Sequence, residues 1–163
     1  MKINSLLIIM FLFGTSLLQA QNNQVIRLFE KYENEDNVTI IKISKAMFNL
    51  IPGNIITDKI NIKNIYSKIE SLLILTSDKQ EMATKMSNDF KSFIDRNKNY
   101  EELMRIKDNK KDNKSDIIFY AIKKGDFINE FFMLVNNEKE FVAIRIAGNF
   151  LEGDIQQLVD DMQ

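Results

Sequence analysis

The sequence predicts an α+β fold: a two-layer sandwich in which helices pack on a mostly antiparallel sheet of about six strands. Two observations indicate this class. In the second half of the chain, β-branched and aromatic runs are separated by short turn-like segments, and connections this short favour an antiparallel meander. Helical spacing of apolar residues occurs near both ends of the chain and in one long central segment.

The first half of the chain alternates between helical and extended patterns. Residues 23–33 place apolar side chains at i, i+3, i+4 and i+7, which predicts an amphipathic helix. Residues 38–43 are rich in β-branched side chains and predict a strand. Ser44 is expected to cap a short helix that ends before Pro52, and residues 54–66 are expected to form a loop because their isoleucines have no clean period.

A buried strand and the longest helix follow. Residues 68–75 are almost continuously apolar and predict the strand. Asp78 is expected to cap the helix, with Glu81 as its reciprocal partner in a capping box. The inner face of this helix is predicted to consist of Met82, Met86, Phe90, Phe93, Ile94 and Asn97.

The remaining chain predicts a meander and a last helix. Strands are expected at residues 102–107, 116–123, 127–135 and 140–147. The segment at 108–115 is rich in oxygen ligands, but Lys110 and Lys114 occupy ligand positions of a calcium loop, so we expect a solvated hairpin turn. Gly148 and Asn149 are expected to turn the chain toward the last helix. The apolar stripe of that helix would be Ile155, Leu158, Val159 and Met162, and Asp154 would be its N-cap.

Two of the expected strands, residues 116–123 and 127–135, are apolar on both faces. A soluble antiparallel sheet normally keeps one face polar, so something must cover the second face. We expect helices to do so; the alternative is an exposed patch that binds another copy or a partner. The residues of this interaction patch would be Phe127, Phe131, Phe132 and Met133.

The first twenty residues predict a secretory signal peptide. Lys2 precedes an apolar run at residues 6–13, and Ala20 offers a small residue for cleavage. The run is too short to span a bilayer, so no transmembrane anchor is expected. We expect cleavage near Ala20, a single domain over residues 21–163, and a periplasmic or secreted location.

Composition excludes several function classes. The chain contains no His and no Cys, which excludes zinc sites built from imidazole or thiolate, a serine triad with a histidine base, and thiol chemistry. The formal net charge is −1, and basic and acidic residues are interleaved, so we expect no nucleic-acid partner. We also expect no cofactor, no metal site and no catalytic residue that the sequence can name.

Six separated patterns together resemble a known family. They are Phe29-Glu30-Lys31-Tyr32, Ser44-Lys45-Ala46-Met47, Ile69-Glu70-Ser71-Leu72, Tyr100-Glu101-Glu102-Leu103-Met104, Glu130-Phe131-Phe132-Met133-Leu134 and Ile146-Ala147-Gly148-Asn149-Phe150. In their order and spacing they resemble the exported Bacteroidota family called domain of unknown function 4252. The resemblance covers essentially all of the mature chain. It implies a small periplasmic or envelope-facing α+β protein and no established activity.

Three functions remain open at this point. The preferred hypothesis is an exported, non-catalytic module that binds an envelope protein or a small ligand, with homo-oligomer formation as an option. A carboxylate-dependent envelope hydrolase is the second; it predicts a cleft with two carboxylates about 5–10 Å apart, one of them with a raised pKa. A chaperone-like envelope assembly factor is the third.

Overall fold

The computed structural model describes residues 24–50, 67–110, 113–137, 139–151 and 153. The expected signal peptide, the expected loop at 54–66 and the expected last helix lie outside these residues. The chain divides into two units, Met1–Glu35 and Asp36–Gln163.

In the first unit, residues 24–30 form a helix that continues as turns through Asn34. The peptide N–H of Lys31 donates to the carbonyl of Arg27 at 3.0 Å, which closes the last helical turn. Val25, Phe29 and Tyr32 are fully buried. Their spacing of i, i+4 and i+7 confirms the apolar stripe expected from the sequence.

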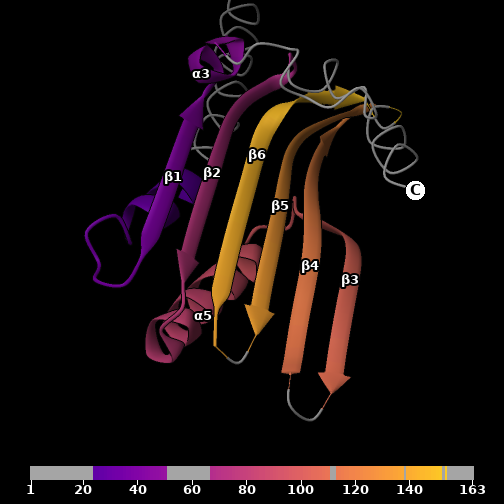
Figure 1. Cartoon of the computed structure of the whole chain (residues 1–163). Helices are drawn as coiled ribbons and strands as arrows, with labels where there is room; N and C mark the ends of the chain where they lie inside the picture. The colour runs from indigo at the N-terminus through magenta and orange to yellow at the C-terminus, as the bar shows by residue number, and fades with distance from the viewer. Residues whose placement is uncertain (1–23, 51–66, 111–112, 138, 152, 154–163) are drawn as a thin grey trace, which may run out of the picture. The chain divides into compact units, whose positions relative to one another are not determined.

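The second unit contains the expected antiparallel sheet of six strands, and their order is β1-β2-β6-β5-β4-β3 (Figure 1). In chain order its elements are β1 (Thr39–Ser44), α3 (Lys45–Leu50), β2 (Ile69–Ser77), α5 (Gln80–Arg96), β3 (Glu101–Lys110), β4 (Asn113–Lys124), β5 (Phe127–Asn137) and β6 (Phe141–Leu151). The last four strands form the meander that the short connections predict.

Helix α5 packs against one face of the sheet, behind it in Figure 1. The ring of Phe90 lies 5.8 Å from that of Phe132 on β5 and 5.4 Å from that of Phe141 on β6. The buried side chains of α5 are Ala83, Met86, Phe90, Phe93 and Ile94. The expected inner face is therefore confirmed for Met86, Phe90, Phe93 and Ile94. Met82 is only half-buried, and its neighbour Ala83 is buried instead.

The start of α5 differs from the prediction. The N-cap residue is Lys79, and its side chain makes no capping hydrogen bond, so the capping box of Asp78 and Glu81 is wrong. The reason is that β2 extends to Ser77, which pairs with Phe141 of β6. The chain needs two further residues to leave the sheet before the helix begins.

Strands β3 and β4 extend farther than expected. Asp108 pairs with Ser115 and Asn109 with Lys114, so most of the segment predicted as a turn belongs to the hairpin ladder. Polar and charged side chains are tolerated on an outer hairpin because its edge faces water. The prediction of a hairpin is confirmed, and its predicted turn is too long.

Strand β6 also continues through Gly148 and Asn149, where a turn was expected. The register with β5 shifts here, because Ile128 pairs with Phe150 whereas Glu130 pairs with Ala147. Gly148 and Asn149 therefore form a bulge in β6. A Cβ atom at Gly148 would lie 2.4 Å from the carbonyl oxygen of Lys68. Glycine is needed here for close backbone approach, and the strand does not turn.

A second apolar cluster lies at one end of the sheet, where α3 adds Phe48. Its buried members are Phe48, Ile69, Ala121, Ile128 and Phe150, and Ile43, Leu72, Phe131 and Ile146 pack against them. Phe131 pairs with Ile146, and Phe132 beside it faces α5. Because neighbouring residues of a strand point to opposite faces, this cluster is on the side away from α5.

Candidate functional site

A cavity of about 490 Å³ lies between the C-terminal half of α5 and strands β3, β4 and β5. An adjoining hollow of about 760 Å³ runs toward the end of the β3–β4 hairpin. Both are lined by Ser87 and Asn88 of α5, Asp116 of β4 and Asn136 of β5. These shared walls make the two hollows one groove along the side of α5.

A bulge in β3 gives the cavity its charged wall. Glu102 pairs with Tyr120, and the register then shifts so that Arg105 pairs with Ile118. In a regular strand, residues i and i+3 point to opposite faces. The extra residue in the bulge reverses that alternation and brings both side chains to the α5 side.

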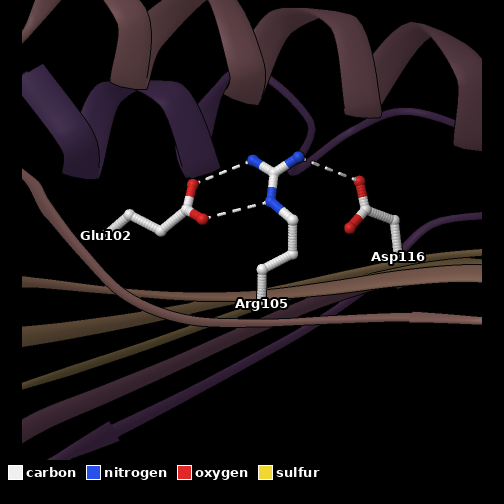
Figure 2. A network of polar contacts seen from close by, with 3 residues as sticks. All are labelled: Glu102, Arg105 and Asp116. Carbon is white, nitrogen blue, oxygen red and sulfur yellow. Dashed lines mark hydrogen bonds and ion pairs between the residues drawn. The ribbon is translucent and has the colours of Figure 1, made fainter.

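Arg105 lies between two carboxylates in this wall (Figure 2). Its Nη2 donates to Glu102 Oε2 at 2.9 Å and its Nε to Oε1 at 3.2 Å, while Nη1 lies 3.6 Å from Asp116 Oδ2. The bond to Glu102, and then the charge of Asp116, raises the pKa of Arg105. This planar two-point contact fixes the guanidinium in one orientation.

One carboxylate oxygen of Asp116 receives no hydrogen bond from the described residues. This atom, Oδ1, is buried. Removing a carboxylate oxygen from water without a partner costs free energy, so this atom favours an incoming donor. Asp116 lines both hollows, so the unsatisfied oxygen belongs to a residue of the groove wall.

Tyr120 closes the floor of the cavity beside Glu102. The residue is 8% exposed. Burial, followed by the nearby charge of Glu102, raises the pKa of its hydroxyl. Tyr120 is therefore a neutral hydrogen-bonding group at physiological pH.

A second polar network lies deeper, under α5. Arg145 Nε donates to Glu130 Oε2 at 2.8 Å, and Arg145 Nη1 donates to Ser71 Oγ at 3.3 Å. The Tyr100 hydroxyl donates to the other oxygen, Glu130 Oε1. Glu130 and Arg145 are 6% and 2% exposed. Every charged atom named here is paired, as a buried ion pair requires.

Tyr100 connects this network to the cavity, since it also forms part of the cavity wall. Its ring lies 5.8 Å from that of Phe93 and 6.0 Å from that of Phe132, both in edge-on arrangements. Burial and then the charge of Glu130 raise the pKa of Tyr100 far above its ordinary value. Tyr100 therefore remains a protonated donor to Glu130.

Two of the three carboxylates that line the cavity have a counter-charge. Glu102 and Asp116 are both ion-paired with Arg105, which disfavours either of them as a general base. Within the described parts of the chain, no three Asp or Glu side chains gather closely enough to hold a metal ion. None of the helices in those parts is long and apolar enough to cross a membrane.

The interaction patch expected from the sequence is divided between the two faces. Phe132 is 1% exposed and lies under α5. Phe131 and Met133 are half-buried on the opposite face, where the ring of Phe131 lies 5.7 Å from that of Phe150. Phe127 is exposed at the start of β5. A role for these residues in binding remains a prediction.

Sequence reasoning did not find either polar network. Glu130 and Arg145 carried a usable signal, because each is a lone charge at an inward position of an apolar strand. Glu102 and Arg105 carried none, since only the bulge places them on one face.

Comparison with known proteins identifies the family. Among solved structures, the chain is similar to PA94 of Pseudomonas aeruginosa, a protein of unknown function, with a TM-score of 0.34, 8% identity, and coverage of 77% of this chain and 76% of that one. No curated protein matches the chain. The model of the family described as "domain of unknown function (DUF4252)" matches residues 32–158. The chain therefore belongs to the DUF4252 family.

Proposed function

We propose that this protein is an exported, non-catalytic binding module of the bacterial envelope, which holds a small polar ligand in the cavity between α5 and strands β3–β5. The proposal is carried by Asp116, a residue of the cavity wall whose buried Oδ1 has no hydrogen-bond partner among the described residues. A rotation of the carboxylate would turn this oxygen toward an N–H or O–H group of a ligand, which would satisfy the acceptor. Few but convergent polar groups in a concave site are the usual form of a small-molecule site.

The charges of the lining restrict the ligand. Three basic side chains in the cavity, Lys91, Lys98 and Arg105, are offset by Asp95, Glu102 and Asp116. A site without an excess of either sign does not concentrate ions of one charge. The ligand class that fits is therefore uncharged or zwitterionic, with hydroxyl or amide groups.

The test is a thermal-shift panel of sugars, amino acids, small amides and nucleosides against the protein and two variants. Asp116→Asn removes the acceptor charge, and Asp126→Asn makes the same change at an exposed turn. We expect a compound that raises the Tm of the wild type and of Asp126→Asn, with the shift reduced in Asp116→Asn. Equal shifts in all three proteins would contradict a site at Asp116.

Export to the periplasm of a Bacteroidota host is the second part of the proposal, and the N-terminal segment supports it. Expression of the full chain with fractionation and N-terminal sequencing tests it. We expect periplasmic protein that begins at Gln21. Protein that keeps Met1 and stays in the cytoplasm would contradict export.

Two alternatives make different predictions. A carboxylate hydrolase would convert a compound of the panel into product, and that activity would depend on Glu102 or Asp116. A chaperone-like assembly factor would instead suppress aggregation of unfolded envelope proteins through Phe127, Phe131 and Met133. Turnover or client capture without ligand binding would replace the proposed function.

A further inference from the structure

The sheet face away from α5 is apolar from one edge to the other. The strand register places residues of all six strands in rows across this face. The central row is Ile41, Ile74, Ile144, Met133, Phe119 and Met104. A flanking row is Thr39, Thr76, Val142, Val135, Ile117 and Ile106. The other flanking row is Ile43, Leu72, Ile146, Phe131, Ala121 and Glu101.

Little of the described second unit covers these rows. Helix α3 contributes Phe48 over the row that contains Phe131. Helix α5 is on the other side, and between Asp36 and Leu151 no other described helix lies over the central row (Figure 1). At the two sheet edges, Ile41, Met104 and Ile106 are 43%, 48% and 48% exposed. Apolar side chains this exposed at both edges of one face are typical of an interaction surface.

The charge distribution on this face identifies the kind of partner. Glu101 is the only charged residue in the three rows, and it lies at the β3 edge. Just beyond the rows, Asp108 of β3 shares this face with Ser115 and Asn137. Glu140 accepts a hydrogen bond from Thr76, and Lys123, two residues after Ala121 on β4, forms an ion pair with Glu101. An uncharged centre with a polar rim is the anatomy of a protein interface. The rim contains three acidic residues and one basic residue, Lys123, which is paired with Glu101. This acidic excess disfavours an anionic lipid surface, which attracts basic residues.

We propose that this face, independently of the cavity, is the interface of a homodimer in which two copies pack sheet against sheet. A face with no central charge is complementary to itself, because neither copy leaves a charge unpaired. At strand spacings of about 4.8 Å and same-face spacings of about 6.8 Å, the three rows cover roughly 600 Å². That area per copy corresponds to the lower end of stable interfaces, about 1,200 Å² in total.

Symmetry places one residue pair near the dimer axis. Strands β6 and β5 are the middle strands of the sheet, and their Ile144 and Met133 pair in the central row. A two-fold axis through the middle of the face brings each of these residues close to its own copy. Because the chain has no cysteine, a single introduced thiol reports this proximity through a short bismaleimide cross-linker that spans the roughly 10 Å between packed sheets.

The experiment combines sedimentation velocity with thiol cross-linking on protein purified after export. We expect a dimer for the wild type, at least a tenfold higher dissociation constant for Met133→Lys, and a covalent dimer when Met133→Cys is treated with a short bismaleimide cross-linker. Glu81→Cys, at the exposed start of α5, is the matched control and should not cross-link. A monomeric wild type, or a dimer that neither Met133 variant affects, would overturn the proposal. Met133→Cys decides the question if Met133→Lys does not fold.

Discussion

The two faces of the sheet are similar in apolar content and differ in how they accommodate charge. The face under α5 contains the buried Glu130 and Arg145 and, farther out, Glu102 and Arg105. On the opposite face the described charges lie at the rim: Glu101, which is ion-paired with Lys123, then Asp108, and Glu140, which accepts a hydrogen bond from Thr76. The difference indicates that the covered face is specified by paired polar groups, whereas the open face is shaped for contact with another apolar surface.

The largest effect is expected from breaking the buried pair. Arg145→Met leaves Glu130 as an unpaired buried charge, and we expect the free energy of unfolding to fall by about 3–5 kcal/mol. Urea denaturation measures it. The double variant Arg145→Met with Glu130→Leu should recover much of that loss, because no charge is then buried alone. A loss below about 1 kcal/mol in the single variant would show that Glu130 is not desolvated.

The next comparison uses adjacent phenylalanines on β5. Phe132→Ala removes a fully buried ring that contacts Phe90, and we expect a cost of about 3–5 kcal/mol. Phe131→Ala removes a half-buried ring on the other face, and in dilute monomer its cost should be smaller by about 2 kcal/mol. Equal urea midpoints for the two variants would contradict the assignment of the faces.

Tyr100→Phe is expected to cost about 1–3 kcal/mol, because one buried oxygen of Glu130 loses its donor. It should also change the response to alkaline pH. The pKa of Tyr100 is raised in the folded state, so unfolded chains lose this proton first, starting near pH 10. Folded stability is therefore complete below about pH 10 and decreases above it. The variant should lose less stability between pH 9 and 11 than the wild type, as measured by thermal unfolding across that range.

The smallest effect is expected at the exposed pair in the cavity wall. Glu102 and Arg105 are 43% and 42% exposed in their side chains, and such pairs contribute about 1 kcal/mol or less. Glu102→Gln should therefore change the free energy of unfolding by less than about 1 kcal/mol at low salt, and by still less at 1 M salt. A larger, salt-independent loss would mean that this wall is part of the folding core.

The sequence predicted the sheet well because local sequence patterns are enough to identify its strands. The β-branched runs of β1 and β2 and the short connections among β3 to β6 require only period and turn length to interpret. The inner face of α5 was predictable for the same reason, since Met86, Phe90 and Phe93 repeat at helical spacing. The start of α5 was not, because the register of β2 with β6 overrode the capping preference of Asp78.

The candidate site lay beyond sequence reasoning because it depends on register. The bulge between Glu102 and Met104 decides that Arg105 faces Asp116, and no residue type in that segment marks a bulge. Likewise, Gly148 could be interpreted as a turn residue until the approach of Lys68 was known. Alternation did predict that Phe131 and Phe132 face opposite ways, but not which face α5 covers.

The central claim, that one face stabilises the fold and the other joins two copies, is tested most directly by urea unfolding at two protein concentrations a hundredfold apart. A dimer interface makes the midpoint rise with concentration. We predict this rise for the wild type and for Phe132→Ala, at a lower midpoint, and a smaller rise in Met133→Lys. A wild-type midpoint that is independent of concentration would contradict the claim.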